Sequence, residues 1–283
     1  MRRPRGIARY FLFFAFALAG CISGNASFPT ASSWEQQQVS AFLRLPDGPG
    51  PHPAVVLLHG CGGLERERPG QFVWRGLNLH ANALLEIGIA TLIVDSWGSR
   101  GLYFDELMRT NCRWGAAGIR VDDLYGAIDY LNGLPAIDGS RIGAVGLSEG
   151  GRAVLRALQT DHYRNRPHRL TASVAFYPPC YGLAPPFYAP SLILIGDADD
   201  ITPSQPCLSL VHVAELATGN TVFSVDMPRE APLVHVYAGV HHSFDLPFSG
   251  MHQIPIGTVA ASPEATHDAR ARMVEFFRKY LLP

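Results

Sequence analysis

The sequence has no excess of charge of either sign. Its 283 residues include 23 lysines and arginines against 24 aspartates and glutamates, for a formal net charge of -1. Beyond the extreme N-terminus no run of like charge occurs. A nearly neutral surface gives no electrostatic reason to expect a nucleic acid or an anionic membrane surface as a partner. We therefore expect a small molecule as the partner and no nucleic acid.

Metal-binding motifs and internal repeats are absent as well. The 11 histidines are scattered, with neither H-E-x-x-H nor paired C-x-x-C spacing. His241 and His242 are adjacent, and adjacent side chains rarely face one ion. The sequence therefore predicts no metal and no cofactor. Its length, with 47% hydrophobic residues, favours a single α/β domain with a large core.

A long apolar run occurs only at the N-terminus. Four arginines within the first nine residues precede an apolar run over residues 10–19. This run is shorter than the about 20 residues that a membrane-spanning helix needs, and it is typical of a signal-peptide core. Leu18-Ala19-Gly20-Cys21 resembles the lipobox of bacterial lipoproteins, in which the Cys becomes the lipid-modified first residue.

These features predict an exported protein. We expect a signal peptide over residues 1–20, a lipid anchor on Cys21, a tether over residues 21–36 and one domain over residues 37–283. The expected location is the bacterial cell envelope, facing the periplasm, with membrane contact only through the anchor. The alternative is cleavage after Ala26, which would give a soluble periplasmic or secreted protein.

Strand and helix patterns alternate along the rest of the chain. Val39, Ala41, Leu43 and Leu45 alternate with less apolar neighbours, and residues 54–58 are wholly apolar. Further strand patterns cover residues 89–94, 142–147, 174–177, 192–195 and 233–237, and helical patterns cover residues 121–131 and 273–281. Ser262-Pro263 and Thr202-Pro203 are typical of helix starts, with Ser or Thr as N-cap. The order predicts a mostly parallel central sheet flanked by helices on both faces.

The strongest functional signal is Gly146-Leu147-Ser148-Glu149-Gly150, which matches G-x-S-x-G between a strand pattern and a helical one. Such a turn projects the hydroxyl above the sheet, and its glycines permit a backbone that a Cβ would obstruct. The helix N-terminus favours developing negative charge. Ser148 is the candidate nucleophile, and the alternative is a glycine-rich turn without a catalytic role.

An acid and a base follow two later strand patterns. Asp197, Asp199 and Asp200 follow one of them, and His241 and His242 follow the next. Because the carboxyl ends of parallel strands form the ligand-binding edge of a sheet, we expect these residues to converge with Ser148. The chain order Ser, Asp, His is the order of the α/β-hydrolases.

Four segments together resemble the dienelactone hydrolase family: residues 55–63, the Ser148 turn, residues 196–203 and residues 237–244. The resemblance runs from about residue 39 to the last helix, and it implies an α/β-hydrolase fold. The acid segment of the family resembles a glycine, two variable residues, the Asp, three more residues and a proline. Its histidine segment resembles Tyr-x-Gly-x-x-His-x-Phe.

These family segments select the acid and the base. Laid on this sequence they select Asp199 and His242. Asp197, Asp200 and His241 are then alternatives that form turns or supporting hydrogen bonds. The founding members of the family carry a Cys where this sequence has Ser148, so we expect a general serine esterase or lactonase acting through an acyl-enzyme.

Candidate oxyanion donors follow from position. They are the backbone N–H of Glu149, directly after the nucleophile, and that of Cys61 or Gly62 after the first buried strand. His59 is expected to hold this loop by a hydrogen bond.

Two other functions remain open. One is a peptidase of the same fold, although such peptidases usually carry a large extra domain. The other is a catalytically idle envelope protein that retains the fold.

Three rim segments are candidate pocket walls. Trp97 and Arg100 follow a strand end, and Arg100 either binds a substrate carboxylate or pairs with Asp95 or a loop carbonyl. Tyr177 follows another strand end and either lines the acyl pocket or packs in the core. Residues 247–261 are loop-like and are a candidate cover of the site.

Four cysteines remain besides Cys21, an even number for an oxidising compartment. In the fold that the resemblance implies, the strand before Cys61 neighbours the one before Cys112, and the same holds for Cys180 and Cys207. Of three possible pairings we expect Cys61–Cys112 and Cys180–Cys207. The alternative is four buried free thiols.

Overall fold

The structure is a computed structural model that describes residues 24–33, 35–64, 71–109, 116–159, 165–217 and 232–282. The predicted signal peptide over residues 1–20 and the predicted lipidation site Cys21 lie outside the described residues. Within the described ranges, no helix combines the length and the apolar character that crossing a membrane requires.

Strands and helices alternate along the chain as the sequence predicts. The strands are β1 (Gly24–Pro29), β2 (Gln38–Arg44), β3 (His52–Leu58), β4 (Ala90–Asp95), β5 (Ile137–Leu147), β6 (Ala172–Phe176), β7 (Ser191–Gly196), β8 (Leu233–Tyr237), β9 (Met251–Ile254) and β10 (Gly257–Ala260). The helices are α1 (Gln71–Leu85), a short 3₁₀ turn η1 (Gly98–Arg100), α2 (Phe104–Arg109), α3 (Ala116–Asn132), α4 (Glu149–Ala157), α6 (Gln205–Ala217) and α7 (Pro263–Leu281).

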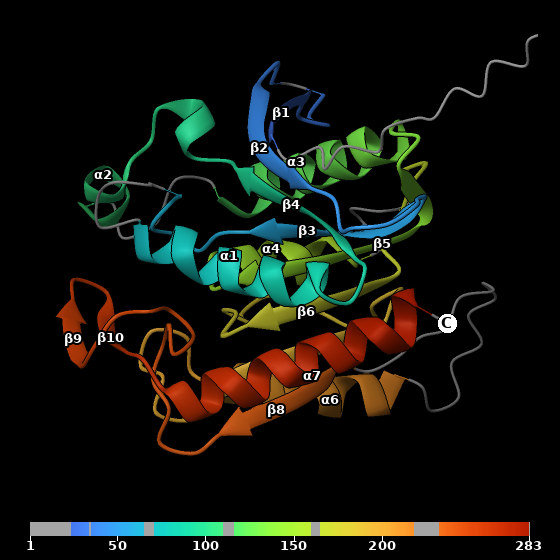
Figure 1. The fold of residues 1–283 in the computed structure, drawn as a ribbon. Helices are drawn as coiled ribbons and strands as arrows, with labels where there is room; N and C mark the ends of the chain where they lie inside the picture. The colour runs from blue at the N-terminus through green and yellow to red at the C-terminus, as the bar shows by residue number, and fades with distance from the viewer. Residues whose placement is uncertain are drawn as a thin grey trace, which may run out of the picture.

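The central sheet is mostly parallel, which confirms the predicted architecture. Its strand order is β1-β2-β4-β3-β5-β6-β7-β8. Strands β3 to β8 pair in parallel, whereas β2 pairs antiparallel with β4 and with β1. The parallel strands point towards the end of the molecule where α2 and the β9–β10 hairpin lie (Figure 1). The loops that follow β3, β5, β6, β7 and β8 therefore meet at one edge.

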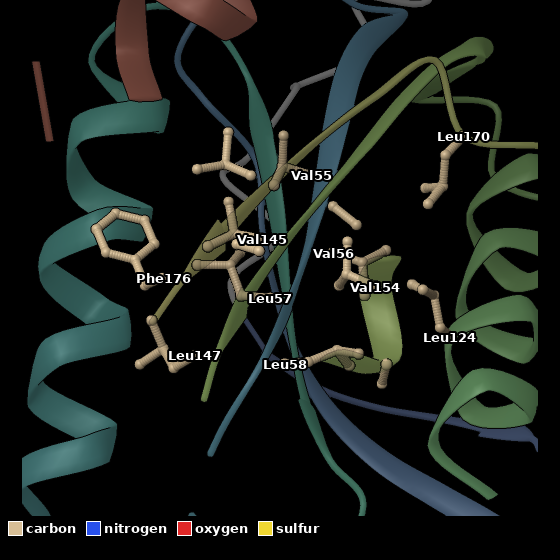
Figure 2. Close-up of a cluster of buried hydrophobic side chains, with 14 of the residues drawn as sticks. Val55, Val56, Leu57, Leu58, Leu124, Val145, Leu147, Val154, Leu170 and Phe176 are labelled. Carbon is tan, nitrogen blue, oxygen red and sulfur yellow. The ribbon is translucent and has the colours of Figure 1, made fainter. Parts of the chain in front are cut away.

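Helices cover both faces of the sheet. Helices α1 and α7 contact each other on one face, and α3 and α4 contact each other on the other face (Figure 1). Figure 2 shows Val55 and Leu57 on the side of α1, and Val56 and Leu58 on the side of α3. All seven residues of β3 are buried. Burial on both faces explains why this strand is wholly apolar in sequence.

The prediction of a tether is wrong for residues 24–29. These residues form β1, which pairs with β2 through six residue pairs. Phe28 is 1% exposed and stacks on Tyr130 with ring centroids 5.7 Å apart. Strand pairing uses backbone groups, so a stretch rich in small polar residues can add to a sheet without a strong apolar alternation.

The two predicted helix starts have different outcomes. Ser262 is the N-cap of α7, where its side chain accepts a hydrogen bond from the N–H of Ala265, as predicted. Helix α6 begins at Gln205, so the prediction of Thr202 as its N-cap is wrong. The Thr202 hydroxyl donates to the Asp199 carboxylate instead.

The prediction that residues 247–261 form an irregular loop is wrong for two short stretches. Strands β9 and β10 form an antiparallel hairpin within this segment. The hairpin is joined to the histidine segment by a bridge between Val259 and His242, and the N–H of Ala260 donates to the carbonyl of His242 at 3.2 Å.

A disulfide bond ties two of the rim loops together. Cys180, after β6, is bonded to Cys207 in the first turn of α6, with Cα atoms 5.1 Å apart, as predicted. The bond therefore connects the segment after β6 with the segment after β7. Cys61 is also disulfide-bonded, and its predicted partner Cys112 lies outside the described residues.

Replacing both Cys180 and Cys207 with Ser should lower the free energy of unfolding by about 3.5 kcal/mol, the chain-entropy value for a sequence separation of 27. Urea denaturation followed by circular dichroism measures the change, with Ser209→Ala on the exposed side of α6 as a control. Equal midpoints for the double variant and the wild type would contradict this expectation.

Candidate active site

The Ser148 turn has the strained geometry that its motif predicts. Ser148 lies between β5 and α4 with φ 51° and ψ -119°, a left-handed conformation that is rare outside glycine. A Cβ on Gly146 would collide with the backbone of Gly150, and one on Gly150 would lie 2.5 Å from the carbonyl oxygen of Leu58. The N–H of Ser148 donates to the carbonyl of Phe176 at 2.9 Å. The glycines thus permit the close packing that holds the hydroxyl above the sheet edge.

The structure brings the three predicted side chains together. Oγ of Ser148 lies 3.0 Å from Nε2 of His242, and Nδ1 of His242 lies 2.7 Å from Oδ2 of Asp199. Asp199 is 3% exposed and His242 is 4% exposed. A hydroxyl, an imidazole and a buried carboxylate in this order can deprotonate the hydroxyl and stabilise the imidazolium that results.

The Asp199 carboxylate is held in place by three donors. Its Oδ1 accepts the N–H groups of Ile201 at 2.9 Å and Thr202 at 2.8 Å, and its Oδ2 accepts the Thr202 hydroxyl at 2.8 Å. The same hydroxyl lies 3.1 Å from Nδ1 of His242. Thr202 is therefore a supporting residue that the sequence prediction missed. Thr202 follows Asp199 by three residues, a spacing at which an Asp side chain often bonds to the backbone of a turn. This spacing could have indicated a Thr that supports the carboxylate.

The alternative acids have other partners. Asp197 accepts the N–H of Gly239 at 2.6 Å. Asp200 accepts the N–H and the hydroxyl of Thr258, each at 2.8 Å, and these bonds lower the pKa of Asp200. Asp197 thus joins two strand ends, and Asp200 fastens the β9–β10 hairpin.

Arg100 and Trp97 do not line the cavity, so their prediction as pocket residues is wrong. The Arg100 guanidinium forms ion pairs with Glu35 and Asp123, both at 2.9 Å, and donates to the carbonyl of Ser96. The bond to the Ser96 carbonyl confirms the alternative that Arg100 pairs with a loop carbonyl, whereas its two carboxylate partners are Glu35 and Asp123. Trp97 is 2% exposed and packs in a small cluster with Cys61, Leu107 and Met108.

His59 is structural, as predicted. It is fully buried, and its Nδ1–H donates to the carbonyl of Gly60 at 2.6 Å. Burial lowers the pKa of His59 well below its usual value, and the nearby Arg120 lowers it further. Nη2 of Arg120 donates to the carbonyl of His59 at 2.5 Å. The loop after β3 is therefore fixed by both residues.

A cavity of about 830 Å³ opens beside Ser148 and His242. Gly60, Cys61 and Gly62 line it next to the nucleophile, and Glu149 is the first residue of α4. Tyr177 lines the cavity and also packs in the core, where it is 1% exposed, so both interpretations of this residue are confirmed. The rest of the described wall is largely apolar, and residues 246–249 together with the β9–β10 hairpin form one side of it.

Known proteins resemble this chain in sequence and in fold. The model of the dienelactone hydrolase family matches residues 39–281. The chain is 34% identical over 116 residues to 2,6-dihydropseudooxynicotine hydrolase of Paenarthrobacter nicotinovorans, covering 41% of this chain and 27% of that enzyme. The match thus spans about a quarter of that relative's length.

Solved structures show the same fold at low sequence identity. Dienelactone hydrolase from Anabaena variabilis is similar with a TM-score of 0.56 at 20% identity, over 91% of this chain and 99% of that chain. Dipeptidyl peptidase 4 from Porphyromonas gingivalis is similar with a TM-score of 0.60 at 17% identity, over 92% of this chain and 35% of that chain. The fold is therefore common to enzymes with different names, and it does not choose between ester and amide substrates.

Replacing Asp199 with Asn should slow phosphonylation of Ser148 by a fluorophosphonate probe by about 10⁴-fold, the loss in turnover that this substitution causes in another Ser-His-Asp triad. The amide favours the wrong imidazole tautomer. Asp197→Asn and Asp200→Asn are matched controls and should react at rates close to that of the wild type. Rapid phosphonylation of Asp199→Asn together with slow phosphonylation of Asp197→Asn would contradict the assignment of Asp199.

Proposed function

The chain belongs to the dienelactone hydrolase family, and on this premise we propose that it is a serine hydrolase that cleaves ester or lactone bonds of small carbonyl substrates. The observation that carries the proposal is the unbroken chain from Oγ of Ser148 through His242 to Asp199 at the mouth of a cavity. Each member is buried or half-buried, so few water molecules compete with these hydrogen bonds.

The reaction proceeds in two steps. Nε2 of His242 accepts the proton of Ser148 while Oγ attacks the carbonyl carbon, and the same proton then passes to the leaving alcohol. Water activated by His242 hydrolyses the acyl-enzyme. Asp199 holds the Nδ1–H tautomer and stabilises the imidazolium. A Ser hydroxyl is a weak nucleophile at its free pKa, so the reaction depends strongly on His242.

The oxyanion of each tetrahedral intermediate needs donors close to Ser148. We assign this role to the N–H of Glu149 and to that of Cys61 or Gly62. Glu149 starts α4, where N–H groups lack partners within the helix. Cys61 and Gly62 line the same cavity as Ser148, and a Cβ on the preceding Gly60 would lie 3.3 Å from Cβ of Ser148. Such a donor typically contributes about 3 kcal/mol to lowering the barrier.

Two alternatives are distinguishable by experiment. A peptidase of this fold would hydrolyse amides, and an idle protein would react with nothing. The peptidase alternative is supported by fold likeness alone, because this chain covers only 35% of the peptidase chain that it resembles. Esters have better leaving groups than amides, and the single domain provides no further substrate-binding unit among the described residues.

The wild-type protein should be labelled by a fluorophosphonate probe and should hydrolyse p-nitrophenyl acetate, whereas Ser148→Ala should do neither. Loss of Oγ removes the bond-forming atom, so turnover should fall by about 10⁶-fold, as for nucleophile removal in another serine hydrolase. Labelling is read by in-gel fluorescence, and turnover is read by absorbance. A matched p-nitroanilide should be left intact. Faster turnover of the anilide than of the ester would favour the peptidase, and absence of labelling in folded protein would favour the idle protein.

We propose in addition that the protein is exported and anchored in the bacterial cell envelope through a lipid on Cys21. The supporting features are the cationic lead, the apolar run and the lipobox-like residues before Cys21.

Cys21→Ala should move the protein from the membrane fraction to the soluble fraction, because the acyl chains would have no attachment site. Immunoblotting of fractionated cells measures the shift. Mass spectrometry of the N-terminal peptide provides the second readout. A mature chain that begins at Ser27 would contradict the anchor and support ordinary cleavage.

A further inference from the structure

A second buried carboxylate lies behind the catalytic imidazole. Asp245 follows His242 by three residues, and its side chain is 0% exposed. Its Oδ1 accepts the hydroxyl of Tyr177 at 2.6 Å, and its Oδ2 accepts Nε2–H of His80 at 2.6 Å. His80 comes from α1 and Tyr177 follows β6, so three separate segments converge on this carboxylate. The reaction steps described above use none of these contacts.

The ring of His80 is enclosed in the core beside the carboxylate that it contacts. The ring is fully buried and packs against Phe176 with centroids 4.6 Å apart. Its Nδ1 has no hydrogen-bond partner among the described residues. Asp245 therefore binds the Tyr177 hydroxyl on one oxygen and His80 on the other, in the buried interior.

Tyr177 connects this carboxylate to His242. The rings of Tyr177 and His242 form a T-shaped contact with centroids 4.5 Å apart and planes inclined by 62°. Burial first, and then the charge of Asp245, holds the pKa of Tyr177 well above its usual value, so the phenol remains a donor.

The backbone of Tyr177 is strained and is held on both sides. Its φ is 38°, which is costly for an aromatic residue. Its N–H donates to the carbonyl of Leu194 at 2.7 Å, and its carbonyl oxygen lies 3.0 Å from Oγ1 of Thr202. The fold therefore maintains a costly conformation that keeps this ring against the imidazole.

The other groups around His242 come from three segments. Ser148 of the nucleophile turn lies at Nε2, Asp199 lies at Nδ1, and His252 lines the same cavity from the hairpin. The Asp199 carboxylate is the group in direct contact with the imidazole. Tyr177 covers another side of the ring, with the Asp245 carboxylate beyond it.

We propose that Tyr177, Asp245 and His80 form a positioning unit that stabilises the imidazolium form of His242. The inference rests on the proposed serine mechanism, in which the proton leaves Oγ of Ser148 and binds to Nε2 of His242. Asp245 has no Lys or Arg ion pair in the described part of the chain. When His242 becomes positively charged, the phenol that this carboxylate polarises presents its ring to the new cation. An interaction that strengthens in the transition state accelerates the reaction, whereas one that is equally strong in the resting enzyme does not.

The test compares Tyr177→Phe and Asp245→Asn with the wild type on p-nitrophenyl acetate. Each substitution should lower kcat by about tenfold while KM changes less than about twofold, because substrate contacts remain and only the charged imidazole loses support. The acidic limb of the kcat/KM profile should move to lower pH by up to about one unit, because a less stabilised imidazolium releases its proton at lower pH.

Tyr125→Phe is the matched control. Tyr125 is buried, and its hydroxyl donates to the carbonyl of Ala157 at 2.8 Å. Neither residue belongs to the described wall of the cavity. Tyr125→Phe should lower the free energy of unfolding about as much as Tyr177→Phe does, but its kcat/KM profile against pH should match that of the wild type. In the double variant Tyr177→Phe/Asp245→Asn the two losses should not multiply, because the phenol transmits the effect of the carboxylate.

Unchanged kcat and an unchanged acidic limb in Tyr177→Phe, with normal ester turnover by the wild type, would overturn the inference and leave these residues a structural role. Tyr177→Phe keeps the ring and removes one oxygen, so it decides the question even if Asp245→Asn does not fold. A wild-type protein that neither reacts with fluorophosphonate nor hydrolyses esters would overturn the proposed function, and the positioning role with it.

Discussion

The hydrogen bond of 3.0 Å between Oγ of Ser148 and Nε2 of His242 is the constraint on which the site depends. It joins two residues that are 94 positions apart, so it exists only because strands β5 and β8 end at the same edge of one sheet. Parallel pairing from β3 to β8 fixes that edge, and burial of both sheet faces fixes the strands. The core thus sets the distance at which proton transfer is possible.

Backbone strain is concentrated at this edge. Among the described residues, the non-glycine positions with positive φ are Ser148, Tyr177 and Ser243. They are the proposed nucleophile, the residue whose ring packs against the proposed base, and the residue that follows that base. Strained conformations persist where surrounding bonds determine them, and here the N–H groups of Ser148 and Tyr177 donate to neighbouring strands. The hydrogen bonds to the sheet therefore hold Ser148 and Tyr177 in these strained conformations.

Each of the four aspartates that follow strands β7 and β8 has a different hydrogen-bond partner. Asp199 faces the imidazole, Asp197 joins two strand ends, Asp200 holds the hairpin, and Asp245 holds Tyr177. Four carboxylates near one histidine have four different partners, so the charge that reaches the imidazole directly is that of Asp199. The hairpin that Asp200 fastens is also a wall of the cavity, so the shape of the cavity is coupled to the loop that carries Asp199.

The sequence by itself determined the order of strands and helices, the Ser148 turn and the two strand ends that carry candidate acids and bases, and the resemblance to the dienelactone hydrolase family then selected Asp199 and His242 among them. Periodicity and turn chemistry are local, and the positions just past strand ends follow from them. Only the tertiary structure decided which partner each remaining polar group has. Arg100 reaches Glu35 across 65 positions and is withdrawn from the cavity, and His80 reaches Asp245 across 165 positions. Residues 24–29 became a strand because β2 offered an unpaired edge. Such pairings depend on how elements pack in three dimensions, and no spacing within the sequence encodes them.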